Sequence, residues 1–204
     1  MRLPLGAPEA LPTTVDVGGR AFTIAHDFRA GIRFETMMYD PDVPEDAKPV
    51  LGLGIWYGAE LPDADPRELM RAALEFYRCG KPEAEGSAKR LYDFSHDDQM
   101  IYAAFMQAYQ VDLYAVEYLH WWRFRAMFGA LPKECQFVEA VGWRGAKPGK
   151  GMSAEQKRHM RRMKKLYALP DSTRRRALTD EEYEARIAEV VARKVVESSQ
   201  EAMR

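Results

Sequence analysis

The chain has 204 residues, of which 47% are hydrophobic and 30% are charged, and its formal net charge is −1. This composition is typical of a globular protein, and the length is sufficient to bury a large apolar core without disulfide bonds or metal ions. No segment approaches the roughly 18 apolar residues of a transmembrane helix, and the N-terminus lacks a signal-peptide or transit-peptide pattern. We therefore expect a cytoplasmic protein with no membrane contact.

A small β-hairpin is predicted near the start of the chain. Apolar and polar residues alternate over 14–17 and 20–24, on either side of Gly18-Gly19, a dipeptide that tolerates the positive φ angles of a two-residue turn. Because an isolated hairpin is marginally stable in water, we expect it to pack on the following helices or to pair with a strand from another chain.

Helix start and stop signals cover most of the remaining chain. The best start signal is Asp65-Pro66-Arg67-Glu68, a capping aspartate followed by proline and glutamate, and Gly80 ends that helix. Asp27, Ser95 and Ser153 are the expected caps of three others. In chain order, the predicted helices cover about 27–39, 45–57, 65–80, 95–109, 113–129, 132–142, 153–167 and 179–203.

The segment 92–131 is dense in aromatic residues around His120-Trp121-Trp122. Fully burying a large apolar side chain stabilises a fold by roughly 1.5 to 3 kcal/mol, so this segment should dominate the core. The expected core residues are Phe105, Leu119, Trp122 and Met127.

Charge divides the chain. Residues 144–176 contain 12 Lys or Arg against two acids, which gives +10, while the remaining chain carries −11. We predict a mainly α fold, a bundle of six to eight helices with the N-terminal hairpin. The predicted parts are an acidic body over 1–143, a Gly/Pro/Lys linker over 144–152, and a basic helix plus a C-terminal amphipathic helix over 153–204.

Catalytic and metal-binding patterns are incomplete in this sequence. Glu117 and His120 have the spacing of half a di-metal site, but no second Glu-x-x-His is present. The glycines and lysines of 145–150 lack the order of a phosphate-binding loop. Cys79 and Cys135 form no metal-ligand pair, and we expect free thiols, with a single disulfide as the alternative. The sequence therefore predicts a protein that is not an enzyme and has no cofactor and no bound metal.

Three interpretations of the basic helix remain open. It is a solvated face without a function, an arm that contacts nucleic-acid phosphates, or an amphipathic element that binds a partner protein. Methionines suit the third because they repack easily. The candidate partner-binding residues are Met160, Met163, Tyr167, Arg161, Arg162, Lys164, Lys165, Tyr183, Ile187 and Val191.

Several motifs resemble a family of tailed-phage proteins designated by gene product number fifteen. They are VDVGGRAFTI, HDFRAGIRFE, EFYRCGK, LYDFSHDDQMIYAAFMQAY, DLYAVEYLHWWRFRAMFGALP and KKLYALPDS, and they extend from about residue 12 to residue 176. Genes of this family are commonly found near the tape-measure gene, and the proteins are often described as tail assembly chaperones.

The resemblance implies a non-enzymatic protein of phage or prophage virion assembly. Such a chaperone keeps the helical tape-measure protein soluble, binds it or the tail tube subunits, and acts in the host cytoplasm without entering the mature virion. No catalytic residue is carried over with the family. Self-association is compatible with an acidic body and a basic segment. The alternative function is a nucleic-acid-binding phage protein that uses 144–176.

Overall fold

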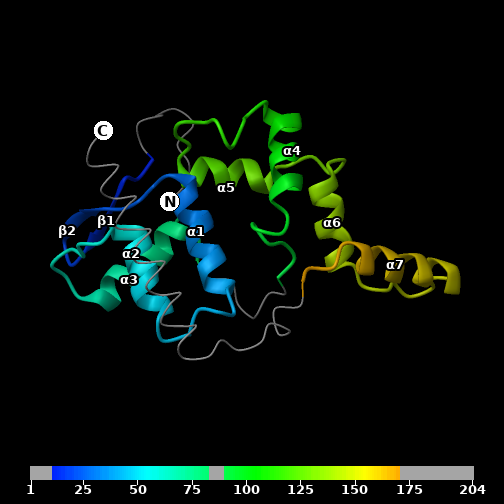
Figure 1. Cartoon of the computed structure of the whole chain (residues 1–204), viewed down its shortest axis with the longest axis horizontal. Helices are drawn as coiled ribbons and strands as arrows, with labels where there is room; N and C mark the ends of the chain where they lie inside the picture. Colours follow the sequence, from blue (N-terminus) through cyan, green and yellow to red (C-terminus); the bar gives the residue numbers. More distant parts are fainter. Residues whose placement is uncertain (1–10, 83–89, 171–204) are drawn as a thin grey trace.

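The computed structural model describes residues 11–82 and 90–170. This part of the chain forms a two-stranded hairpin and seven α-helices, which confirms the predicted mainly α fold (Figure 1). None of these helices is long and apolar enough to cross a membrane. The elements are β1 (Thr14–Val17), β2 (Arg20–Thr23), α1 (Phe28–Tyr39), α2 (Lys48–Tyr57), α3 (Pro66–Tyr77), α4 (Asp98–Tyr109), α5 (Trp121–Gly129), α6 (Gln136–Gly145) and α7 (Ala154–Leu166).

The hairpin has the predicted two-residue turn. Gly18 and Gly19 adopt φ angles of 61° and 80°, which only glycine adopts without steric cost. The strands are antiparallel, with Val15 opposite Phe22 and Val17 opposite Arg20. Val17 is buried against α2 and α3, so the hairpin is stabilised by packing on the helices of its own chain.

The three following helices begin close to their predicted positions. The side chains of Asp27 and Asp65 accept hydrogen bonds from the backbone N–H groups of Arg29 and Arg67, which caps α1 and α3. The second helix begins at Lys48 and not at residue 45, because Pro49 suits only the first turn of a helix.

A core of aromatic side chains joins α1, α3, α4 and α5. Trp121, Phe124 and Phe105 are completely buried, and their rings pack in stacked pairs with centroids 5.1 to 5.7 Å apart. Of the four predicted core residues, Phe105 and Trp122 are buried members of this cluster, whereas Leu119 and Met127 are half-buried and pack against it. The indole N–H groups of Trp121 and Trp122 donate to the carbonyl oxygens of Tyr77 and Phe76, at 2.9 Å each.

The predicted helix over 113–129 is wrong in its first half. Residues 110–120 are not helical, and α5 begins only at Trp121. The side chain of Asp112 accepts hydrogen bonds from the N–H groups of Tyr114 and Ala115, which favours a local turn. Glu117 and His120 therefore do not share a helical face, and the spacing considered for a metal site has no structural basis.

Two further helix bounds differ from prediction. The fourth helix begins at Asp98 and not at Ser95, because Asp93 accepts hydrogen bonds from the N–H groups of Ser95 and His96 in a preceding turn. The sixth helix runs from Gln136 to Gly145, later than the predicted 132–142. The first two residues assigned to the linker are consequently helical, and the connection between α6 and α7 comprises residues 146–153.

Candidate functional site: a basic arm

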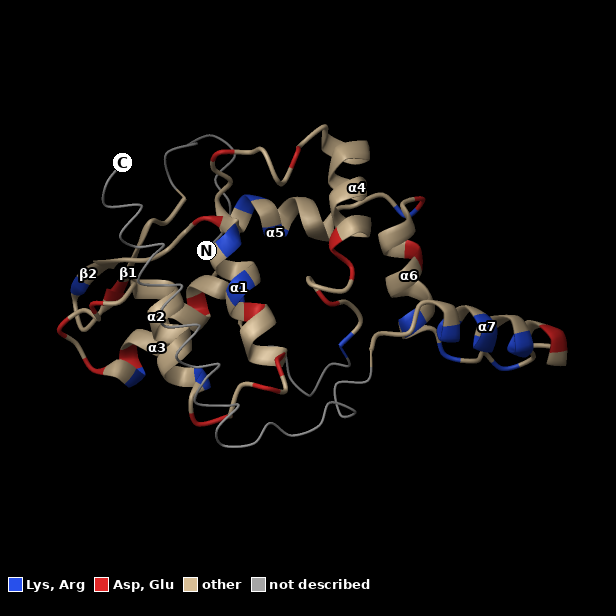
Figure 2. Cartoon of the chain, viewed as in Figure 1, with Lys and Arg blue, Asp and Glu red and all other residues tan. Residues whose placement is uncertain are grey.

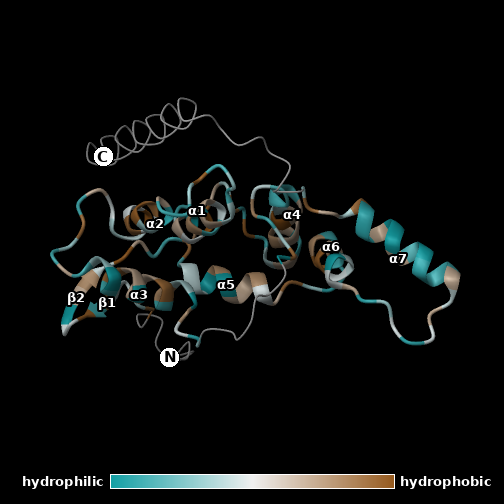
Figure 3. Ribbon diagram, turned by 90° about the horizontal axis from the view of Figure 1, so that it is seen from below, coloured by the Kyte–Doolittle hydropathy of each residue, from teal (hydrophilic) through white to brown (hydrophobic). Residues whose placement is uncertain are grey.

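The connection 146–153 and α7 together form a projecting structure, here called the basic arm (residues 146–166). It contains eight Lys or Arg residues and a single acid, Glu155. Both views place α7 at one end of the molecule and the hairpin at the other (Figures 1 and 3). Figure 2 shows the Lys and Arg positions concentrated along this end. The charge division seen in the sequence is therefore also a division in space.

The helix of the arm begins as predicted. Ser153 accepts a hydrogen bond from the N–H of Gln156, and the Gln156 side chain accepts one from the N–H of Ser153. This reciprocal capping box fixes the start of α7. Lys164 and Lys165 lie in the last turn, where cations interact favourably with the helix dipole.

A buried ion pair anchors the arm to the body. Arg144, at the end of α6, donates two hydrogen bonds to the Asp97 carboxylate, at 2.6 and 2.8 Å. Their side chains are 4% and 0% exposed. Arg144 also donates to the carbonyl oxygens of Leu91 and Tyr167. One guanidinium thus connects α6, the segment before α4 and the end of α7, so the arm has a defined position.

The apolar side of α7 faces its own chain. Met160 is buried, and the His159 ring makes an edge contact with Trp143 of α6, with centroids 5.5 Å apart. Lys164 donates to the carbonyl oxygen of Ala146 at 2.6 Å. The methionine seam therefore covers α6 in the isolated chain, and Met160 is not available on the surface for a partner.

The opposite side of α7 is a cationic surface, here called the α7 basic face. None of the ion pairs formed among residues 11–82 and 90–170 involves one of its cations. Leu166, at its end, is 69% exposed, so the surface combines charge with an apolar side chain. The residues of the α7 basic face are Lys157, Arg158, Arg161, Arg162, Lys165 and Leu166, all of them exposed.

The structure divides the predicted partner-binding residues into three groups. Arg161, Arg162 and Lys165 lie on the α7 basic face, and Lys164 lies beside it with its ammonium on Ala146. Met160 is buried, while Met163 and Tyr167 are half-buried. Tyr183, Ile187 and Val191 lie outside the described residues.

The anchoring role of Arg144 and Asp97 was missed from the sequence. The sequence pattern places Arg144 in the linker, and it predicts Ser95 as the helix cap and gives Asp97 no role. The sequence contains only a weak signal for this ion pair. Arg144 follows the apolar positions Val138, Val141 and Trp143, so it lies at the end of a helix that packs on the core.

His120 has a structural role in the family motif. Its Nδ1 accepts a hydrogen bond from the N–H of Trp122, and its Nε2 lies 3.0 Å from the carbonyl oxygen of Pro12. The neutral ring with its proton on Nε2 satisfies both contacts. Burial lowers the pKa of His120 below its ordinary value of 6.5, and the neighbouring His26 ring acts in the same direction. His120 is thus the cap of α5.

A second polar group is enclosed between α1, α3 and α5. Tyr77 donates a hydrogen bond to the buried Glu35 carboxylate, and Arg125 donates to the Tyr92 hydroxyl at 3.1 Å. Burial, followed by the effect of Glu35, raises the pKa of Tyr77, and burial raises that of Tyr92 to about 12. These buried polar side chains form hydrogen bonds with one another, so they stabilise the packing of the three helices. Within 11–82 and 90–170, no group of three or more His, Cys, Asp or Glu side chains is placed to hold a metal ion.

The fold and the arm together define a mainly helical protein with an exposed cationic face at one end. The family described as Bacteriophage Gp15 protein matches residues 8–169, from the segment before the hairpin to the end of the arm. The chain belongs to this family. Comparisons with curated proteins and with solved structures give no match.

Proposed function

We infer that this protein acts in phage tail morphogenesis as a tail assembly chaperone. Its partner is the helical tape-measure protein, the tail tube subunits, or both, and its role is not enzymatic. It acts in the cytoplasm of the bacterial host before the tail is complete and does not remain in the mature virion. Membership of the phage family supports the setting, and the α7 basic face supports the mode of binding.

The observation that carries this proposal is an exposed cationic helix held in place by a buried anchor. Four arginines and lysines at 157, 158, 161 and 165 occupy successive turns without carboxylate partners among the described residues. An amphipathic client helix with acidic flanks complements such a face, and opposite charges steer the encounter. Because Arg144 fixes α7 on the body, little conformational entropy is lost when the face binds.

Co-expression with the tape-measure protein of the same phage genome tests this function. We expect a higher soluble yield of the tape-measure protein, and a loss of that gain when Arg161 and Arg162 are both changed to Glu. The matched control changes Arg123 and Lys133 to Glu, two exposed cations of the body. Equal soluble yields with and without the wild-type protein contradict the chaperone function.

Changing Met160, Met163 and Tyr167 together to Ser is a less selective test. Because Met160 is buried on α6, this variant also disturbs the packing of the arm on its own chain. A loss of client binding in it has two explanations, whereas the Arg161 and Arg162 change alters only exposed side chains.

The same α7 basic face supports nucleic-acid binding as a second candidate function. Phosphate binding by several cations weakens steeply as salt rises, through the release of counterions. Titration of the purified protein into labelled duplex DNA at about 150 mM salt checks it. Binding that is lost in the Arg161→Glu, Arg162→Glu variant favours this alternative, and a flat titration removes it.

A further inference from the structure

We propose that copies of this protein associate head to tail, with the tip of the basic arm of one copy docked in a groove between β1 and α3 of the next. The tip is the exposed, non-helical segment 147–151, which carries Lys147 and Lys150. The groove lies at the other end of the molecule. This inference concerns the purified protein alone and does not depend on the proposed client.

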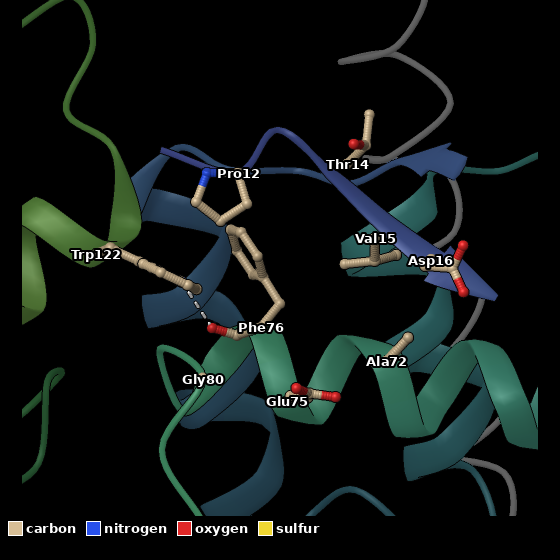
Figure 4. Close-up of a pocket in the computed structure, with 9 residues that line it drawn as sticks. All are labelled: Pro12, Thr14, Val15, Asp16, Ala72, Glu75, Phe76, Gly80 and Trp122. Atoms are coloured by element: carbon tan, nitrogen blue, oxygen red, sulfur yellow. Dashed lines mark hydrogen bonds between the residues drawn. The ribbon is translucent and has the colours of Figure 1, made fainter. Parts of the chain in front are cut away.

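The groove is a pocket of about 220 Å³ beside the first strand. Figure 4 shows β1 crossing over α3, with Pro12, Phe76 and Trp122 at the inner end of the pocket and Glu75 on α3. The inner end is apolar and suits the methylene stem of a lysine. The remaining lining residues are Thr14, Val15, Asp16, Ala72 and Gly80.

Two carboxylates, those of Asp16 and Glu75, give this pocket its charge. The exposed carboxylates of Asp16 and Glu75 form no ion pair with any residue in 11–82 or 90–170. The N–H of Ile24 donates to the carbonyl of Thr13, so residues 13, 15 and 17 face β2 in the antiparallel ladder. The N–H and carbonyl groups of Thr14 and Asp16 consequently point away from β2, and a lysine ammonium can donate hydrogen bonds to these carbonyls.

The tip of the arm complements this pocket. Lys147 and Lys150 are exposed, and no ion pair within the described residues involves either of them. Pro148, Gly149 and Gly151 keep the segment out of a helix, so it is narrow enough to approach a groove between two elements. A lysine that enters the pocket places its stem on apolar side chains and its ammonium near Glu75.

Charge and distance favour a second copy over the copy's own arm. The described body, 11–82 and 90–143, has 19 acids and 12 bases, while 144–170 has nine bases and one acid. The basic arm lies at one end of the longest axis, and β1, which borders the groove, lies toward the other (Figures 1 and 2). Because Arg144 holds the arm in place, the tip reaches a groove only in another molecule. Such a heterologous contact does not stop at two copies unless a ring closes.

Sedimentation velocity of the purified full-length protein tests this contact. We expect species larger than a dimer whose proportion rises with protein concentration at about 50 mM salt and falls at about 500 mM salt, where charges are screened within a few ångströms. A monomer at both salt concentrations overturns the proposal, and so does an association that stops at a symmetric dimer.

Neutral substitutions locate the two ends of the contact. The tip variant is Lys147→Gln, Lys150→Gln, and the groove variant is Asp16→Asn, Glu75→Gln. The Asn retains the acceptor for the N–H of Gly19, so the hairpin turn is preserved. We expect each variant to associate at least about tenfold more weakly than the wild type.

A mixture of the two variants gives the most selective readout. The tip variant keeps an intact groove, and the groove variant keeps an intact tip, so an equimolar mixture should form dimers and nothing larger. The controls are Arg123→Gln, Lys133→Gln and Glu117→Gln, Glu134→Gln, which change exposed charges elsewhere by the same amounts. Controls that weaken association as much as the tip and groove variants overturn the proposal, as does a mixture that stays monomeric.

Discussion

Replacing Arg144 with methionine should destabilise the protein strongly, because it leaves Asp97 buried without its cation. The change removes two charge-assisted hydrogen bonds of 2.6 and 2.8 Å to a carboxylate that is 0% exposed. It also leaves the carbonyls of Leu91 and Tyr167 without the guanidinium. Breaking a buried ion pair by removal of one partner costs about 3–5 kcal/mol, so we expect a loss of that size in the free energy of unfolding.

A double-mutant cycle separates the ion pair from the loss of packing. Asp97→Asn alone leaves the guanidinium unpaired, whereas the double variant Asp97→Asn, Arg144→Met has no buried charge at this position. The double variant should therefore be less destabilised than the two single losses added together, with a coupling of at least about 2 kcal/mol. Urea denaturation followed by tryptophan fluorescence and by far-UV circular dichroism measures all four proteins.

A control variant and limited proteolysis show whether this ion pair anchors the arm. Arg161→Met is the control, because Arg161 is exposed on the same arm and its loss should change the stability by no more than about 0.5 kcal/mol. In Arg144→Met, trypsin should cleave within 157–165 faster than in the wild type, since local opening of α7 is easier. A loss below about 1 kcal/mol in Arg144→Met, or strictly additive single effects, would refute the reasoning.

Two further predictions concern the core. A Cβ at Gly31 would lie 2.3 to 2.5 Å from ring atoms of Trp121, so Gly31→Ala should lower the free energy of unfolding by about 1–3 kcal/mol in urea denaturation. A Cβ at Gly142 in α6 meets open space, so Gly142→Ala should raise the free energy of unfolding by about 0.5–1 kcal/mol. Changes of the same sign in the two glycine variants would contradict this packing. Because burial lowers the pKa of His120, the unfolded chain binds the proton more readily, and stability is lost as the pH falls below about 6.5. His120→Asn keeps a cap for the N–H of Trp122 but has no group that titrates in this range. Its melting temperature should therefore fall less than that of the wild type between pH 7.5 and pH 5. Melting temperatures that fall equally in both proteins would refute this.

Local signals predicted the parts of the fold that local chemistry determines. The hairpin turn at Gly18-Gly19, the caps Asp27 and Asp65 and the capping box at Ser153 are all as expected, because each depends on residues within a few positions. Most of the large rings of the aromatic segment lie in the core as expected, whereas Tyr114 and Tyr118 are exposed.

Contacts between distant segments account for the main errors. Residues 113–120 were expected to belong to the α5 helix, but the N–H of Phe28 donates to the carbonyl of Leu119, and the N–H of Trp121 donates to that of His26. These bonds hold residues 119–121 in an extended conformation beside the start of α1. The partner of Arg144 lies 47 residues away at Asp97, and no pattern within α6 indicates it.

The candidate site could be predicted only in part, because it also depends on contacts between distant segments. The basic character and the start of α7 follow from the sequence of the arm itself. Which side of the helix is free depends on α6, which covers Met160 and leaves Arg161 and Arg162 exposed. The sequence therefore indicated the basic helix as the candidate site, whereas its exposed face could be identified only from the packing of the whole chain.

The affinity of the purified protein for the tape-measure protein of the same phage genome tests the proposed function most directly. We predict binding that weakens as salt rises and that is at least about tenfold weaker in the Arg161→Glu, Arg162→Glu variant. The Arg123→Glu, Lys133→Glu control should bind like the wild type. An affinity that is unchanged by the Arg161 and Arg162 substitutions, or an absence of binding by the wild-type protein, would contradict the account.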